Sequence, residues 1–169
     1  MKIIFNASPL IYLGKKRRVE LLKILFEKIM IPSEVEREIM RLPKSPEAVQ
    51  LQEAIEEGWI LVETVPKKET DKIAKLFPEI DEGEAAVIAL AIKEKTENVV
   101  IDDTEARTAA EYFRLKVYGT LYIMLQAFKQ NILKSKDEVR NIVDNMLRRG
   151  FYLSTEVYAK FLYFLEKIN

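Results

Sequence analysis

Two polar turns of the sequence carry side chains that could bind a metal ion. Asn6 and Ser8 follow the first apolar run of the chain, Lys2–Phe5, and Asp102 and Asp103 follow a later apolar run. In a parallel sheet the carboxyl ends of the strands meet at one edge, and ligands bind there. If the two runs form neighbouring strands, an amide, a hydroxyl and two carboxylates converge at that edge.

Two glutamates on predicted helices could add to this group. Glu38 lies in the segment EVEREI, and Glu84 begins the segment EAAVIALAI. Carboxylates that crowd together in a cleft repel one another, and a bound divalent cation relieves the repulsion. Oxygen ligands suit the hard ions Mg²⁺, Mn²⁺ and Ca²⁺. The sequence therefore predicts a site for an ion of this kind.

Each acidic residue also has a purely structural interpretation. Asp102 or Asp103 could cap the helix that follows, although a cap needs only one oxygen and two aspartates stand in succession. Asp81 and Glu84 have the spacing of a capping box, and Glu38 could be a solvated helix residue. No single residue decides between a structural role and metal binding.

The composition excludes several classes of catalytic mechanism and metal site. The chain of 169 residues has no histidine and no cysteine, which excludes a Ser-His-Asp or Cys-His mechanism and Cys-ligated zinc or iron–sulfur sites. Acid–base or metal chemistry must therefore use carboxylates, lysines, tyrosines or hydroxyls. Lys and Arg total 27, as do Asp and Glu, so the overall charge gives no argument for nucleic-acid binding.

Alternating strand and helix patterns place these residues on a sheet. Strands are expected at 2–5, 29–31, 59–65, 98–101 and 115–118, with helical segments between them and C-terminal helices at 121–129, 136–148 and 155–167. This alternation predicts a three-layer α/β/α fold with a central, mostly parallel sheet of four to five strands, followed by extra C-terminal helices.

The length predicts a single domain over residues 1–169. Within it we expect a core at 1–125 and a C-terminal helical extension at 126–169 that packs on the core. The last helix is apolar around most of its circumference, so it packs on the domain or contacts a partner, and packing is the expected outcome. The longest apolar run, Ala85–Ile92, is far shorter than the ~20 residues of a membrane span. The first residues lack the pattern of a signal sequence, and we expect a cytoplasmic protein without membrane contact.

The order of four motifs resembles the PIN-domain family of metal-dependent ribonucleases, particularly the branch related to VapC-type toxins. The motifs are NASPLI, IPSEVEREI, DEGEAAVIALA and VVIDDTEAR, and the segment KVYGTL resembles the last strand of the family. The resemblance extends from residue 1 to about residue 125. It implies that the four acidic positions of the family fall on Asn6, Glu38, Glu84 and Asp103, with Asp102 beside them.

In the family these groups hold one or two Mg²⁺ or Mn²⁺ ions that activate water against an RNA phosphodiester. The resemblance therefore implies a metal-dependent ribonuclease whose catalytic residues are Glu38, Glu84 and Asp103. Asp102 would orient these ligands without itself being the main ligand. It further implies the toxin-type component of a toxin–antitoxin pair, a homodimer and a small antitoxin protein as partner.

Residues that hold the RNA substrate are expected near this site. The hydroxyl residue that accompanies the first acidic position of the family falls on Ser8. The best basic cluster lies just past the first helix and consists of Lys15, Lys16, Arg17 and Arg18. This cluster could contact RNA phosphates, or it could be a solvated junction between a helix and a loop.

Asn6 departs from the family pattern, which usually has aspartate at this position. An asparagine carbonyl can ligate a hard cation, but it brings no charge and cannot bridge two ions. An alternative function is therefore a catalytically weakened PIN-like module that binds RNA or a protein. A flavodoxin-like nucleotide-binding domain is a weaker alternative, because the 5 glycines form no glycine-rich phosphate loop.

Overall fold

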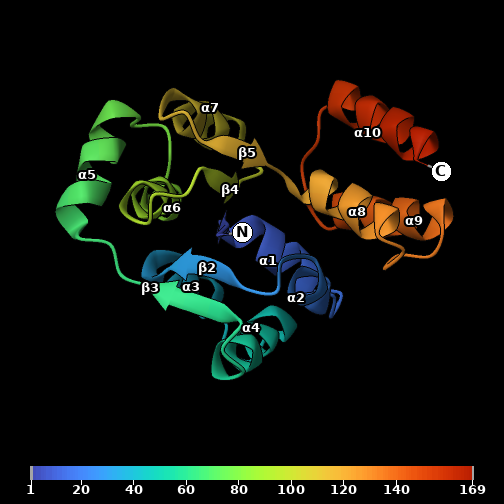
Figure 1. Cartoon of the computed structure of the whole chain (residues 1–169), viewed down its shortest axis with the longest axis horizontal. Coiled ribbons are helices and arrows are strands. Elements are labelled where there is room, and N and C mark those ends of the chain that lie inside the picture. Colours follow the sequence, from blue (N-terminus) through green and yellow to red (C-terminus); the bar gives the residue numbers. More distant parts are fainter. Residues whose placement is uncertain (1, 169) are drawn as a thin grey trace. The chain divides into compact units, whose positions relative to one another are not determined.

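The computed structural model describes residues 2–168 and contains a parallel sheet of five strands (Figure 1). The strands lie in the order β3-β2-β1-β4-β5. They are β1 (Ile4–Phe5), β2 (Ile29–Pro32), β3 (Ile60–Glu63), β4 (Asn98–Val100) and β5 (Lys116–Tyr118). The predicted parallel sheet and each of its predicted strands are confirmed.

The chain forms two compact units, which divide between Gly119 and Thr120. The first unit contains the sheet and helices on both of its faces. These helices are α1 (Ala7–Gly14), α2 (Glu20–Phe26), α3 (Ser33–Ile39), α4 (Pro46–Glu56), α5 (Lys67–Leu76), α6 (Glu82–Lys93) and α7 (Thr104–Tyr112).

The order of the strands reverses at β1. From β1 the chain proceeds through β2 to β3 on one side, while β4 and β5 lie on the other side. Crossovers between parallel strands are right-handed, so the two directions put their helices on opposite faces of the sheet and produce three layers. The carboxyl ends of β1 and β4 therefore form the edge at which such sheets bind ligands.

Hydrogen bonds hold the ends of β1 and β4 together. Ile4 lies opposite Val99, and Phe5 lies opposite Val100. The backbone N–H of Asn6 donates to the carbonyl of Val100 at 2.9 Å, so the pairing extends one residue beyond β1. The two strands whose adjacency the sequence left open are neighbours, and the polar turns that follow them meet.

Helix α6 is buried almost all round, as its apolar sequence predicts. Residues 83–91 are buried, and the helix packs across β1, β2 and β4. It runs back from the carboxyl edge of the sheet toward the start of β4. Its first turn therefore lies at the edge where β1 and β4 end.

The second unit, described through residue 168, consists of helices α8 (Thr120–Lys129), α9 (Lys136–Arg148) and α10 (Thr155–Lys167). Helix α8 contacts both α9 and α10, and Glu166 forms ion pairs with Lys136 and Arg140. The predicted C-terminal helices are confirmed, and the packing of this extension on the core stays a prediction. None of the described helices is long and apolar enough to cross a membrane.

Gly14 is a position where an added methyl group should destabilise the fold. A Cβ on Gly14 would lie 2.6 Å from Cβ and 2.7 Å from Cα of Glu47 on α4. Alanine in place of a helical glycine is normally favourable by about 1 kcal/mol, but here the backbone of α4 occupies the space. We expect Gly14→Ala to lower the free energy of unfolding, measured by urea titration, by about 2 kcal/mol.

Gly58→Ala is the matched control for this variant. Gly58 has a φ of +78°, and an added Cβ would meet nothing within 4 Å. Only backbone strain of about 1 kcal/mol is expected there. Equal losses in the two variants, or a gain in Gly14→Ala, would contradict the close packing of α1 on α4.

Candidate functional site

Oxygen atoms from separate segments of the chain surround Gly83 in the first turn of α6. A Cβ added to Gly83 would lie 3.3 Å from Asp81 Oδ1, 3.4 Å from Glu38 Oε2 and 3.9 Å from Asn6 Oδ1. Asn6 follows β1, and Glu38 lies on α3. One amide oxygen and two carboxylates therefore converge on one point, and the absence of a side chain at Gly83 leaves room for them.

Burial and neighbouring negative charges both act on Glu84. Its side chain is buried, and its pKa is raised to about 7, mainly by this burial. A hydrogen bond from the backbone N–H of Asp81 opposes the rise, and the charges of Asp81, Asp103 and Glu38 contribute to it. These four carboxyl groups thus share one electrostatic environment.

Glu38 experiences the same crowding. It is half-buried, and burial is the main cause of its raised pKa, followed by the charge of Asp81. The guanidinium of Arg41 acts in the opposite direction. The sequence left open whether Glu38 is a solvated helix residue, and the structure instead places its carboxylate among the other acidic groups.

The helix caps that the sequence suggested are also present. Asp81 Oδ1 accepts from the Glu84 N–H at 2.8 Å, and Glu84 Oε2 accepts from the Asp81 N–H at 3.0 Å, which forms a capping box. Asn6 Oδ1 accepts at 2.8 Å from the N–H of the next residue at the start of α1. Asp103 Oδ1 caps α7 by accepting from the N–H of Ala106, three residues on, at 2.9 Å. The side chains of Asn6, Glu84 and Asp103 are thus each held at the start of a helix.

The two aspartates after β4 have different surroundings. Asp103 is exposed, while Asp102 is half-buried. Burial and the charge of Asp102 raise the pKa of the Tyr12 phenol on α1. The charge of Asp102 therefore acts on Tyr12, and the charge of Asp103 acts on Glu84.

The structure separates most of the predicted basic cluster from these carboxylates. Ser8 is half-buried in the first turn of α1, two residues after Asn6. The cluster instead follows the other end of α1, and a helix of this length spans about 12 Å. Within it, Lys15 Nζ lies 5.1 Å from the centre of the Tyr12 ring.

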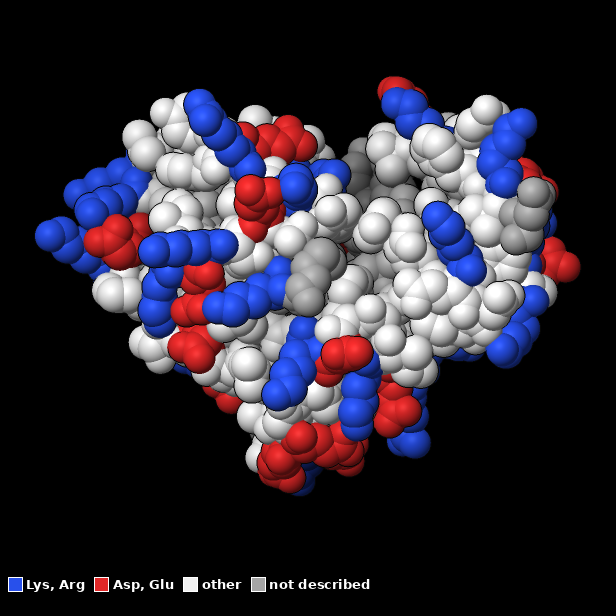
Figure 2. Space-filling model, viewed as in Figure 1, with Lys and Arg blue, Asp and Glu red and all other residues white. Residues whose placement is uncertain are grey.

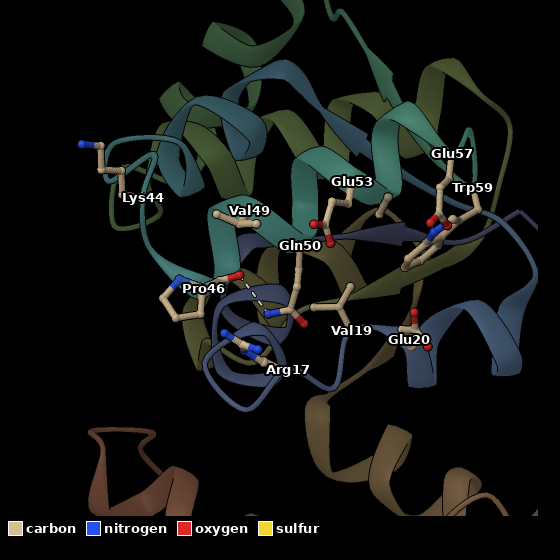
Figure 3. A pocket seen from close by; sticks show the side chains of 11 residues that line it. Arg17, Val19, Glu20, Lys44, Pro46, Val49, Gln50, Glu53, Glu57 and Trp59 are labelled. Carbon is tan, nitrogen blue, oxygen red and sulfur yellow. Dashed lines mark hydrogen bonds between the residues drawn. The ribbon is translucent and has the colours of Figure 1, made fainter.

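Arg17 lines a cavity that contains none of the predicted metal ligands. The cavity has a volume of about 410 Å³ and lies beside α4 (Figure 3). Its charged lining residues are Arg17, Glu20, Lys44, Glu53 and Glu57. None of the predicted metal ligands lines this cavity, so its position does not support a catalytic role.

Charges of both signs are interspersed over the visible face of the protein. Figure 2 shows lysine and arginine side chains next to aspartate and glutamate side chains over this face. This distribution agrees with a formal net charge of +0. Attraction to RNA would therefore depend on a few local contacts.

The donors around Gly83 fit a hard divalent cation by their chemistry. They are all oxygens, which is the donor type that Mg²⁺ and Mn²⁺ prefer. The pKa of Glu84 is raised mainly by burial and also by neighbouring negative charges, and a bound ion would favour its ionised form. Among residues 2–168, no group of three or more acidic side chains is close enough together to form a metal site without rearrangement.

A comparison with family models decides which family this arrangement represents. A model described as a PIN domain matches residues 2–167. The chain is a PIN-domain protein. PIN domains are commonly nucleases, so this PIN domain has the fold of a class of hydrolases. A search of curated proteins gave no match. The predicted family and fold class are confirmed, while the VapC-type branch stays a prediction.

The sequence did not predict that Asp81 belongs to this group of oxygen atoms, because its capping-box spacing with Glu84 is a sufficient explanation for it. Its Oδ1 nevertheless lies beside the point that Glu38 and Asn6 also face. The concentration of acidic residues in the segment DEGE is the signal that could have identified it.

The raised pKa of Glu84 should make the PIN domain less stable as the pH rises. The pKa is about 7 in the folded protein against a usual value of 4.5, so between these values the folded state binds more protons than the unfolded state. Glu84→Gln keeps an oxygen for the capping box but cannot ionise. In metal-free urea titrations, the free energy of unfolding of Glu84→Gln minus that of the native protein should be about 2 kcal/mol larger at pH 8 than at pH 5.

Glu82→Gln is the control, because Glu82 is exposed in the same first turn of α6. Its Oε1 lies 3.9 Å from Nζ of Lys67. This variant should keep the pH dependence of the native protein. Parallel pH profiles for Glu84→Gln and the native protein would contradict the raised pKa of Glu84.

Proposed function

We propose that this PIN domain is a metal-dependent ribonuclease and the toxin-type component of a toxin–antitoxin pair. The observation that carries the nuclease proposal is the convergence of Asn6, Glu38 and Asp81 on Gly83, next to the buried Glu84. This point lies where the strand order reverses, which is where parallel sheets bind ligands. The family match supports a nuclease rather than another ligand-binding function.

The proposed metal ligands are Asn6, Glu38, Glu84 and Asp103, for one or two Mg²⁺ or Mn²⁺ ions. Such ions supply an activated water and stabilise charge on the phosphate. Glu84 holds a proton below about pH 7 and must release it in order to bind an ion. Asp103 caps α7 through Oδ1, and its second carboxylate oxygen could bind the ion. Asp102, which is half-buried and whose charge acts on Tyr12, would orient these groups without binding the ion itself.

The proposed substrate contacts begin at Ser8 and continue to the basic cluster. Tyr12 connects the two regions, because its ring lies near Lys15 and its phenol experiences the charge of Asp102. Lys15 is therefore the member of the cluster best placed for an RNA strand that enters the site. Lys16, Arg17 and Arg18 would contact phosphates farther along the strand.

The toxin role, a homodimer and a small antitoxin partner are supported by the resemblance to VapC-type toxins. Light scattering of the purified protein would test the dimer. Growth arrest on expression, relieved by a variant without nuclease activity, would test the toxin role.

A binding module without catalysis is the second candidate. Asn6 favours it, because its carbonyl already has a structural role as the cap of α1 and brings no charge to a metal ion. In this case the PIN domain would bind RNA or a protein through the same edge without cleaving it.

Asp103→Asn should abolish most RNA cleavage while leaving the fold intact. Asparagine caps helices as well as aspartate does, whereas loss of the charge removes a metal ligand. We expect cleavage of single-stranded RNA in Mn²⁺ to fall by about 100-fold. Asp71→Asn, at an exposed position of α5, is the control and should cleave normally. Cleavage that persists in excess chelator would contradict a metal-dependent mechanism.

Asn6→Asp distinguishes the enzyme from the binding module. Another carboxylate beside Glu38 and Asp81 should lower the melting temperature without metal, because it adds repulsion. With Mn²⁺ the sign should reverse, since a charged ligand binds the ion more tightly and binding stabilises the folded state. The variant should therefore show a larger metal-induced rise in melting temperature than the native protein. If millimolar Mn²⁺ shifts neither melting temperature, the binding module is the better account.

A further inference from the structure

The turn that carries Asp102 and Asp103 is fixed through the backbone of Ile101. The N–H of Ile101 donates to the carbonyl of Tyr118 at 2.9 Å, next to the end of β5. The carbonyl of Ile101 accepts from Nη1 of Arg107 on α7, also at 2.9 Å. The residue before the two aspartates is therefore held on one side by a strand end and on the other by a guanidinium.

Gly119 provides the space in which this guanidinium lies. A Cβ added to Gly119 would lie 3.0 Å from Asp102 Oδ1 and 3.3 Å from Arg107 Nη1. Both distances are shorter than ordinary van der Waals contacts. Gly119 does not have a positive φ, so the backbone conformation would accept another residue. Space, rather than conformation, is what glycine supplies at this position.

Arg107 also brings a permanent positive charge to the acidic edge of the sheet. A guanidinium stays protonated at all relevant pH values and has five donors in a planar arrangement. Nη1 of Arg107 donates a hydrogen bond to the Ile101 carbonyl. The same atom and Oδ1 of Asp102 both lie beside Gly119. The positive charge of Arg107 attracts the Asp102 carboxylate and so restricts the positions that this side chain can take.

We propose that Arg107, seated against Gly119, is a positioning residue of the nuclease site. It fixes the turn after β4 that carries Asp102 and Asp103, and with it the positions of their carboxylates. This inference rests on the proposed function. Arg107 acts through the aspartates and is not itself a metal ligand or a group that reacts.

Four variants of the full chain test this role. Arg107→Gln removes the charge and the planar donor group, and Arg107→Lys keeps the charge. Gly119→Ala leaves Arg107 in place but forces it and Asp102 to move by a few tenths of an ångström. Arg114→Gln is the matched control, because Arg114 is exposed just beyond the end of α7.

The readouts are the Mn²⁺ dependence of the melting temperature, which needs no activity, and kcat and KM for a single-stranded RNA. For Arg107→Gln we expect the Mn²⁺ concentration at half-maximal stabilisation to rise about 10-fold. We expect kcat to fall about 100-fold with KM changed less than about threefold, because misplacement of a ligand affects chemistry more than binding. Arg107→Lys should recover part of both losses, Gly119→Ala should show smaller losses in the same direction, and Arg114→Gln should behave as the native protein.

Native Mn²⁺ dependence and kcat in Arg107→Gln would overturn the inference. A raised KM with a shallower salt dependence and unchanged Mn²⁺ dependence would also overturn it, because Arg107 would then bind an RNA phosphate. If Arg107→Gln does not fold, Gly119→Ala decides, and native behaviour in that variant overturns the inference. Failure of the native protein to bind Mn²⁺ and cleave RNA would instead show that the proposed function is wrong.

Discussion

The parallel pairing of β1 with β4 is the interaction on which the candidate site depends. The hydrogen bond from Asn6 N–H to the Val100 carbonyl extends this pairing beyond β1. As a result, the turn that leads into α1 lies beside the turn that leads into α7. Helix α6 packs beneath both strands and contributes its first turn to the same edge. Burial at this edge raises the pKa of Glu84, and the charges of acidic residues distant in the sequence contribute to the rise.

Helix capping and the proposed metal binding depend on the same atoms. Asn6, Asp81 and Asp103 each begin a helix, where free backbone N–H groups and the helix dipole favour an oxygen acceptor or a negative charge. This attraction offsets part of the repulsion between neighbouring carboxylates. The caps also fix the side chains before any ligand arrives. The structural and functional interpretations of these residues are therefore compatible.

Much of the fold followed from local patterns, whereas the details of the site depended on contacts across the sheet. Apolar runs and capping residues located the strands and helices, and the family motifs identified Glu38 and Glu84. Asp81 was missed because its capping role is a sufficient explanation at the sequence level. Arg107 and Gly119 lie in the motifs VVIDDTEAR and KVYGTL, but the contact between them could not be predicted, since it depends on the spacing between the ends of β4 and β5. The basic cluster was placed near the site because it is close in sequence, yet the length of α1 separates Arg17 from the carboxylates.

The central claim is that carboxylates crowd at this edge and that a divalent cation relieves the crowding. The most direct test is an NMR titration of the Glu84 carboxyl carbon, without metal and at saturating Mg²⁺. The account predicts a pKa of about 7 without metal and a fall of about 2 units or more with Mg²⁺, because the ion competes with the proton for the carboxylate. An ordinary pKa in the metal-free protein, or a raised pKa that Mg²⁺ leaves unchanged, would contradict the account.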